Sequence, residues 1–227
     1  MRAVSGCCCS CCVVGGVGVL LADEFFCVAR SDRTGRPLLH PRVFGLGLAG
    51  ALLGELVLFG RVTIDDGRIC VVHRDPPADA LAHATLAQLL TLSQHREVRT
   101  WLAFLAETAT DAVGQRLALA GVWRRAEHRR FGRARVSWLP VDVNVVAWRP
   151  VRLARVLTSP DSVGVPDAVL AGLVAVTGLA GAVLWQPEHR EVGMARLSAE
   201  VTRLDWPLYH LLAFVEAAVG DAILAPR

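Results

Sequence analysis

The chain has 227 residues, of which 53% are hydrophobic and 20% are charged, and its formal net charge is +3. These values exclude disorder along the whole chain, which requires low hydrophobicity, and the length allows a core to be buried within one domain. The 24 residues of the Lys and Arg class are all arginines spread along the chain, so the net charge alone does not identify a partner.

Five of the seven cysteines lie within residues 7–12. Adjacent cysteines do not easily bridge to one another, and their C-x-x-C spacings have no second pair downstream, so neither a disulfide framework nor a metal site is expected. We predict a disordered, Cys-rich tail over residues 1–17, with a secretory signal ending near Ala22 as the alternative. Cys27 and Cys70 are predicted to be small buried side chains in a reducing cytoplasm.

Residues 19–60 predict two helices separated by a turn. Apolar residues recur at helical spacing over residues 19–29, and the polar stretch Ser31–Gly35 predicts a turn. Pro41 suits the first turn of a second helix, which is expected to continue to a stop at Gly60. Glu55, inside this apolar helix, is expected to act as a cap or to pair with a neighbouring arginine rather than act in catalysis.

Residues 61–121 predict a hairpin followed by helices. Apolar residues alternate over residues 62–71 on both sides of Asp66-Gly67, a pair that favours the turn suited to strand twist. Asp79 is a candidate cap for the next helix. One further helix is expected from Glu97 and another over about residues 110–121.

The last hundred residues combine a basic segment with more helices. Six arginines lie within the twelve residues 124–135, flanked by apolar and aromatic residues, and this pattern predicts two short strands over residues 122–139 with a long basic connection. The remaining helices are expected over residues 145–157, 166–185, 188–204 and 207–224.

These elements predict a mainly α fold, a compact helical bundle with two small β-hairpins, formed by residues 19–225 as one domain. Two apolar stretches, residues 43–60 and 168–185, approach the length of a membrane span. We interpret both as helices buried within the bundle, because the first contains Glu55 and the second contains three glycines. A membrane span is the alternative.

The run GLGLAGALLGELVLFGR over residues 45–61, followed by an Asp-Asp-Gly hairpin, resembles the Golgi phosphoprotein 3 family, particularly its bacterial branch. The segments LLADEFF at residues 20–26 and SDRTG at residues 31–35 resemble that family's opening helix and acidic turn. The resemblance implies a mainly helical peripheral membrane protein. Eukaryotic members recognise phosphatidylinositol 4-phosphate and link the membrane to partner proteins.

This sequence differs from the family's pattern at the positions that bind the lipid headgroup. The family's headgroup-binding Trp and Arg correspond to His40 and Ala49, and a further basic pair corresponds to Glu107 and Thr110. A phosphate site without those donors lacks its strongest charge-assisted hydrogen bonds.

Basic segments are the candidate lipid-binding sites, because arginines near a membrane surface attract anionic headgroups. Trp123, Phe131 and Trp138 are candidates to insert at the interface. The candidate lipid-binding residues are Arg36, His40, Arg42, Arg124, Arg125, Arg129 and Arg130.

The predicted function is that of a noncatalytic protein, cytoplasmic and peripheral to the inner face of the membrane, that binds a phosphoinositide-like or other anionic headgroup and a protein client. It is a candidate homo-oligomer. No cofactor or catalytic residue is expected, because the histidines are scattered and no catalytic motif is present. The alternative is a soluble regulatory module that contacts nucleic acid through a basic, winged-helix-like hairpin. In that alternative Gln115 and Arg116 are the only base readers on the preceding helix.

Overall fold

The computed structural model of the chain describes residues 20–130 and 133–224, with the backbone alone between residues 128 and 135. The predicted tail over residues 1–17 and Phe131 therefore lie outside the described residues. In chain order the elements are α1 (Leu21–Val28), α2 (Pro41–Leu58), β1 (Val62–Asp65), β2 (Arg68–Val71), α3 (Ala80–Thr91), α4 (Val98–Leu119), β3 (Trp123–Arg130), β4 (Arg133–Pro140), α5 (Val143–Thr158), α6 (Val165–Val176), α7 (Ala180–Val183), α8 (Pro187–Thr202) and α9 (Trp206–Leu224). The predicted mainly α class with two small antiparallel hairpins is confirmed.

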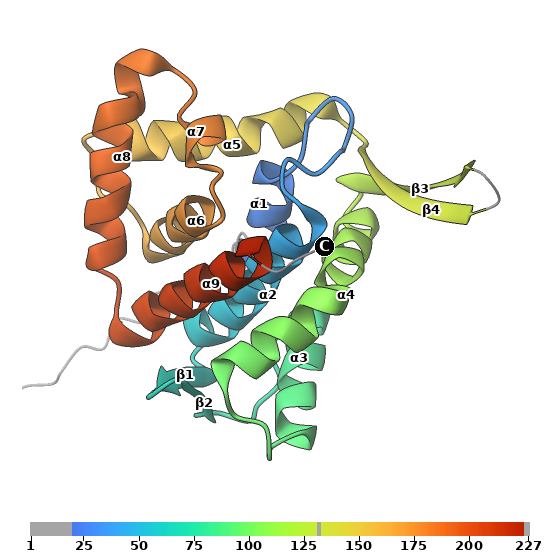
Figure 1. Ribbon diagram of the computed structural model, residues 1–227, viewed down its shortest axis with the longest axis vertical. Helices are drawn as coiled ribbons and strands as arrows, with labels where there is room; N and C mark the ends of the chain where they lie inside the picture. The colour runs from blue at the N-terminus through green and yellow to red at the C-terminus, as the bar shows by residue number, and fades with distance from the viewer. Residues whose placement is uncertain (1–19, 131–132, 225–227) are drawn as a thin grey trace, which may run out of the picture.

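Helix α2 lies at the centre of the fold (Figure 1). Pro41 occupies its first turn, and Gly60, with φ of +65°, follows its end as predicted. Glycines on α2 let neighbouring helices approach closely: a Cβ at Gly45 would lie 2.6 Å from the carbonyl oxygen of Ala106 in α4. Almost every residue from 43 to 56 is therefore buried against α1, α4, α6 or α9.

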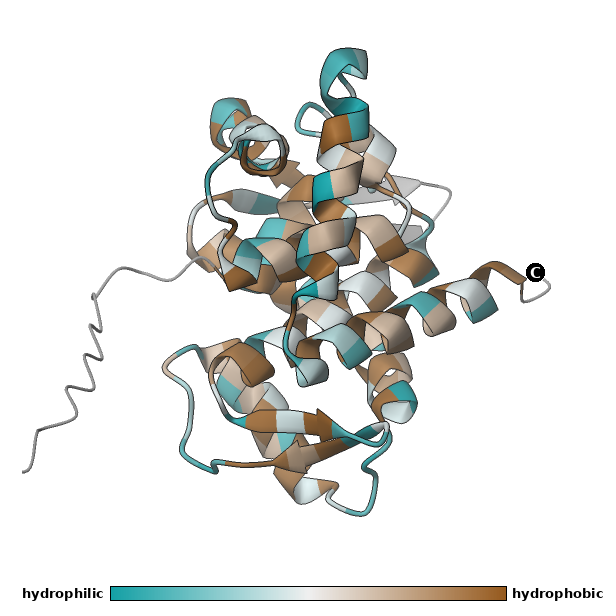
Figure 2. Cartoon of the chain, turned by 90° about the vertical axis from the view of Figure 1, so that its left-hand side faces the viewer, coloured by the Kyte–Doolittle hydropathy of each residue, from teal (hydrophilic) through white to brown (hydrophobic). Residues whose placement is uncertain are grey.

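Hydrophobic residues predominate in the crossing helices, while hydrophilic residues gather on the connecting loops (Figure 2). Two of the described helices, α2 and α9, are long and apolar enough to cross a membrane by length and composition alone. In α2, 78% of the apolar window is buried inside the protein, so it is a core helix. In α9 only 28% is buried, but that buried stripe packs against α2, α4 and α6.

Four predicted elements are wrong in their boundaries. The helices expected from Glu97 and from residue 110 are one continuous helix, α4, because nothing between them breaks helical geometry. The helix expected over residues 166–185 divides into α6 and α7 at Gly178, which adopts φ of +82°. In the basic hairpin all six arginines lie within two eight-residue strands, not in a long connection between short ones.

The hairpin of β1 and β2 turns at Asp66 and Gly67, both with positive φ, as the Asp-Gly pair predicts. Asp79 caps α3 as predicted, accepting a hydrogen bond of 2.8 Å from the amide of Ala82. Cys27 is buried as expected. The prediction that Cys70 is buried is wrong: it lies on the outward face of β2 and is exposed.

Candidate functional site

The first group of predicted lipid-binding residues lies on the turn that joins α1 to α2. The turn is closed by a hydrogen bond of 2.9 Å from the Ser31 amide to the Arg36 carbonyl, and Gly35 at its tip has φ of +67°. Arg36, His40 and Arg42 are all exposed. His40 also caps α2, since its Nδ1 accepts a hydrogen bond of 3.4 Å from the Arg42 amide.

Arg30 fixes this turn to the core. Its side chain is buried and donates a hydrogen bond of 2.7 Å to the Gly35 carbonyl. The guanidinium lies 4.3 Å from the ring centroid of Phe26 and 4.8 Å from that of Phe44, an arrangement that stabilises a desolvated cation. Burial lowers the pKa of Arg30 to about 10, so the group remains charged near neutral pH. Sequence analysis missed this anchor, because nothing local distinguishes Arg30 from the other arginines.

The same turn packs against the base of the β3–β4 hairpin. A Cβ at Gly35 would lie 1.9 Å from the Trp138 carbonyl oxygen and 3.3 Å from the Trp123 ring, so only glycine fits. Trp123 and Trp138 are both buried, with exposed fractions of 1% and 2%. The prediction that these two rings insert into a membrane is therefore wrong: they join the hairpin to α1 and to the turn.

Arg124 and Arg125, the second group of predicted residues, are exposed on β3 just beyond these tryptophans. Arg125 lies 3.2 Å from Glu127 in an exposed ion pair. The side chains of Arg129 and Arg130 lie outside the described part of the structure, although the backbone of β3 continues to Arg130. We define the turn–hairpin surface by its exposed basic residues from both segments, which are Arg36, His40, Arg42, Arg124 and Arg125.

Exposed apolar side chains flank the base of the hairpin. Leu119 ends α4 and is 91% exposed, and Val141, which follows β4, is 58% exposed. A hydrogen bond of 3.0 Å from the Val141 amide to the Val122 carbonyl holds these two connections together. Leu38 on the turn is half exposed as well. The surroundings therefore combine positive charge with isolated apolar side chains.

The positions that correspond to the family's headgroup residues do not form a phosphate site. Ala49 is completely buried within α2. Arg42 and Glu107 line one cavity of about 370 Å³ between α2 and α4, whose other walls are apolar and include Leu46. One arginine beside one glutamate gives no net positive charge, so this cavity fits a phosphorylated headgroup poorly.

A buried ion cluster at the centre of the helices explains Glu55. Its carboxylate is 1% exposed, accepts hydrogen bonds of 3.0 and 3.2 Å from Arg116, and accepts one of 2.8 Å from the Ala22 amide. Arg116 also contacts Asp23 and Asp79, each at 2.8 Å. Burial raises the pKa of Glu55 and of Asp23, although Arg116 opposes it. As expected from the sequence, Glu55 pairs with an arginine and caps a helix.

The same cluster bears on the nucleic-acid alternative. Arg116 was one of two candidate base readers, but its side chain is 11% exposed and fully engaged with carboxylates. Of the two candidate base readers, only Gln115 is exposed. Among the described residues no group of three His, Cys, Asp or Glu side chains is arranged to hold a metal ion.

Helices packed around a central glycine-containing helix, with a projecting basic hairpin, define a mainly α protein of the helical-bundle class. The model of the Golgi phosphoprotein 3 (GPP34) family matches residues 21–224, so the chain belongs to that family. The predicted resemblance is thereby confirmed over almost the whole described chain. The family is one of non-enzymatic lipid-binding and adaptor proteins. No curated protein matches the chain.

Proposed function

We propose that this protein is a noncatalytic peripheral membrane protein that binds anionic lipid headgroups through the turn–hairpin surface. The observation that carries the proposal is the junction at Gly35, where the Arg30 guanidinium holds the turn and the Trp138 backbone contacts it. We propose that this junction brings the exposed arginines of the turn and of β3 to the same membrane surface. A membrane would then meet a preformed basic surface.

Electrostatic attraction accounts for the expected strength of binding. Each arginine near an anionic membrane surface contributes about 1 kcal/mol. Arg36, Arg42 and Arg124 make no ion pair with any carboxylate in the described part of the chain. Together they supply about 3 kcal/mol, to which the arginines toward the hairpin tip and the exposed Leu119 and Val141 would add.

Charge, not a single headgroup, is the proposed basis of recognition. The exposed arginines of the turn–hairpin surface form no enclosed phosphate pocket, and the cavity beside Arg42 is neutralised by Glu107. We therefore expect phosphatidylserine and phosphoinositides to bind in proportion to their charge. On this proposal the protein acts at the cytoplasmic face of a membrane, where it can present a protein client or a second copy of itself.

Flotation of the full chain with vesicles tests the proposal. We expect it to float with vesicles of phosphatidylcholine and phosphatidylserine at low salt, to float less at high salt, and not to float with phosphatidylcholine alone. Changing Arg124, Arg125, Arg129 and Arg130 to Ala should weaken membrane binding by up to about three orders of magnitude, at about 1 kcal/mol for each residue.

The matched control changes Arg155 and Arg203 to Ala and is compared with a hairpin variant that also loses two arginines, Arg124 and Arg125. Both control residues are exposed and lie away from the hairpin, on α5 and directly after α8. Equal loss in the control and the hairpin variant would show that only net charge matters and would overturn the assignment of the surface. Retention on DNA beads without flotation on any vesicle would favour the nucleic-acid alternative instead.

A further inference from the structure

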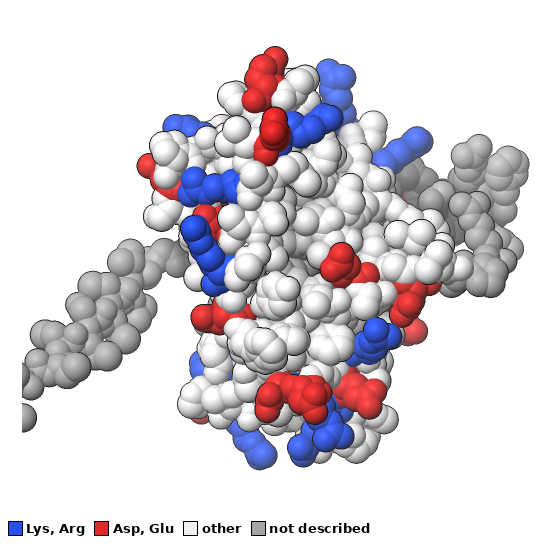
Figure 3. Space-filling view, turned by 60° about the vertical axis from the view of Figure 1, so that its left-hand side comes forward, with Lys and Arg blue, Asp and Glu red and all other residues white. Residues whose placement is uncertain are grey.

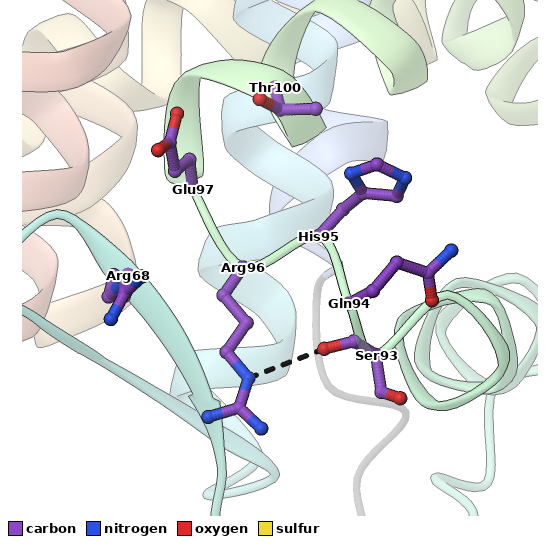
Figure 4. A pocket seen from close by; sticks show the side chains of 7 residues that line it. All are labelled: Arg68, Ser93, Gln94, His95, Arg96, Glu97 and Thr100. Atoms are coloured by element: carbon purple, nitrogen blue, oxygen red, sulfur yellow. Dashed lines mark hydrogen bonds between the residues drawn. The ribbon is translucent and has the colours of Figure 1, made fainter.

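A second basic region, this one a cavity, lies at the other end of α4, by the β1–β2 hairpin. It has a volume of about 500 Å³ and is formed by β2, the loop over residues 92–97 and the first turn of α4 (Figure 4). We call it the β2–α4 cavity. The lining residues that matter for its chemistry are Arg68, Ser93, Arg96, Glu97 and Thr100.

Backbone hydrogen bonds fix the shape of this cavity. The loop runs beside β2, with bonds of 2.7 Å from the Ile69 amide to the Arg96 carbonyl and 3.0 Å from the Val98 amide to the Gly67 carbonyl. On its other side, Trp101 donates from Nε1 to the His95 carbonyl at 2.8 Å. The loop is therefore held from both sides, and the cavity is formed before any ligand arrives.

Two arginines from different segments make the cavity cationic. Figure 4 shows the Arg68 and Arg96 side chains on the same side of the loop, one from β2 and one from the loop itself. Neither makes an ion pair with a carboxylate in the described residues, and Arg96 donates only from Nε to the Ser93 carbonyl, at 3.3 Å. Its two terminal amino groups remain available for a ligand. Glu97 is the single carboxylate that lines the cavity.

This pair is unlike the arginines that join helices through ion pairs. Arg116 and Arg152 each contact two or more carboxylates, and Arg196 pairs with Glu200. The face of the molecule drawn in Figure 3 likewise shows positive and negative side chains interspersed toward its ends. Two arginines without carboxylate partners in one preformed cavity are suited to bind an anion from outside the chain.

An adjoining cavity of about 480 Å³ extends the site. It shares Ser93 and Arg96 with the first cavity and has Leu89 and Leu90 from α3 in its wall, with Arg74 beside them. A cationic compartment next to a partly apolar one matches a ligand with an anionic head and a less polar body. Sites for small molecules commonly combine apolar walls with a few placed polar groups in this range of volume.

We propose that the β2–α4 cavity binds a phosphate monoester, with Arg68 and Arg96 donating to the phosphate oxygens and the adjoining cavity receiving the organic part. Arginine suits this chemistry because its planar group presents parallel donors to phosphate oxygens. The same phosphate monoester occurs on soluble metabolites and on phosphatidic acid, so both sources are tested.

The experiment titrates the full chain with glycerol 3-phosphate by calorimetry and, separately, with vesicles of phosphatidylcholine that contain phosphatidic acid. We expect saturable binding to at least one of these probes. Changing Arg68 and Arg96 together to Gln should weaken that binding by about tenfold or more, since two charge-assisted contacts are lost. Arg99→Gln is the matched control for the single variant Arg68→Gln, because each removes one positive charge. Arg99 lies in the first turn of α4 but pairs with Asp221, outside the cavity.

Binding of glycerol 3-phosphate that the double variant loses supports a soluble ligand, and loss confined to the vesicles supports a lipid ligand. No saturable binding to either probe, or an equal loss in Arg99→Gln, would overturn the proposal. Both arginines are exposed, so the double variant should fold. If its circular dichroism differs from that of the unchanged protein, Arg68→Gln alone carries the test, because it leaves the bond from Arg96 to Ser93 intact.

Discussion

Replacing Arg116 with Met should be among the most destabilising single changes in this protein. Arg116 joins α4 to carboxylates from three other parts of the chain, with contacts of 2.8 Å to Asp23, 3.0 Å to Glu55 and 2.8 Å to Asp79. Met fills a similar volume but leaves these carboxylates without their cation. The cost falls mainly on Glu55, which is 1% exposed, whereas Asp23 and Asp79 retain some contact with water.

Removing one member of a buried ion pair costs about 3–5 kcal/mol, against a total stability of about 5–15 kcal/mol for a typical domain. Urea unfolding followed by circular dichroism measures this loss. In the double variant Arg116→Met with Glu55→Gln, the unpaired charge is gone, so part of the stability should return. Arg99→Met is the control: its ion pair with Asp221 is exposed on both sides and should contribute about 0–1 kcal/mol.

The pH dependence of the Arg116→Met variant provides a second measurement. Burial already raises the pKa of Glu55 above 4.5, and Arg116 opposes that rise, so the pKa increases further without Arg116. A carboxyl with a higher pKa in the folded state contributes stability below its unfolded pKa and loses it as pH rises through the folded pKa. The loss in free energy of unfolding caused by Arg116→Met should therefore be smaller near pH 5 than near pH 7. A loss below about 1 kcal/mol with no such pH dependence would refute the reasoning.

Three further predictions follow from individual contacts. Arg30→Met should cost about 2 kcal/mol, because it removes a desolvated cation from its aromatic surroundings, and should speed amide exchange in the turn before α2. Gly35→Ala should be more destabilising than Gly60→Ala. Both glycines have positive φ, so alanine at either position costs about 1–2 kcal/mol of backbone strain, but only Gly35 also lacks space for a Cβ. An alkylating reagent should modify Cys70 and spare Cys27, because Cys70 is exposed whereas burial raises the pKa of Cys27 to about 12.

Each of these predictions has its own check. Unchanged amide exchange in the Arg30→Met variant would show that other contacts hold the turn. Equal free energies of unfolding for Gly35→Ala and Gly60→Ala would show that the close approach of Trp138 to Gly35 does not matter for stability. Peptide mapping by mass spectrometry locates the alkylated cysteines, and unfolding in urea before labelling should expose Cys27. Labelling of Cys27 in the folded protein would contradict its assigned burial.

Local sequence signals predicted the elements whose causes are local. Pro41, Asp66-Gly67 and Asp79 each determine the backbone around them, and each element begins or turns where they indicate. The packing of α4 against the hairpin was not predictable in this way, because Gly114 leaves room for the Trp138 ring, which comes from another element. The burial of Trp123 has a similar cause, since Phe26 and Cys27 on α1 contact it.

The candidate site was predicted only in part. Exposed arginines could be listed from the sequence, but their grouping depends on Arg30, whose partners lie on both sides of the turn and on the hairpin. The β2–α4 cavity gave no signal, because Arg68 and Arg96 are 28 positions apart and meet only through the pairing of the loop with β2. Arginines that are far apart in the sequence form a site only through tertiary contacts, and the composition of the chain does not predict those contacts.

Helix α4 separates the two basic regions of the molecule. Its 22 residues span about 33 Å, more than three times the distance of about 8–10 Å over which salt screens charges in the cell. Ligands at its two ends would therefore neither repel nor attract one another. If the ligand of the β2–α4 cavity is soluble, a protein attached to a bilayer through the hairpin would hold that cavity well above the lipid, so the bilayer and the soluble ligand could be bound at the same time without competition.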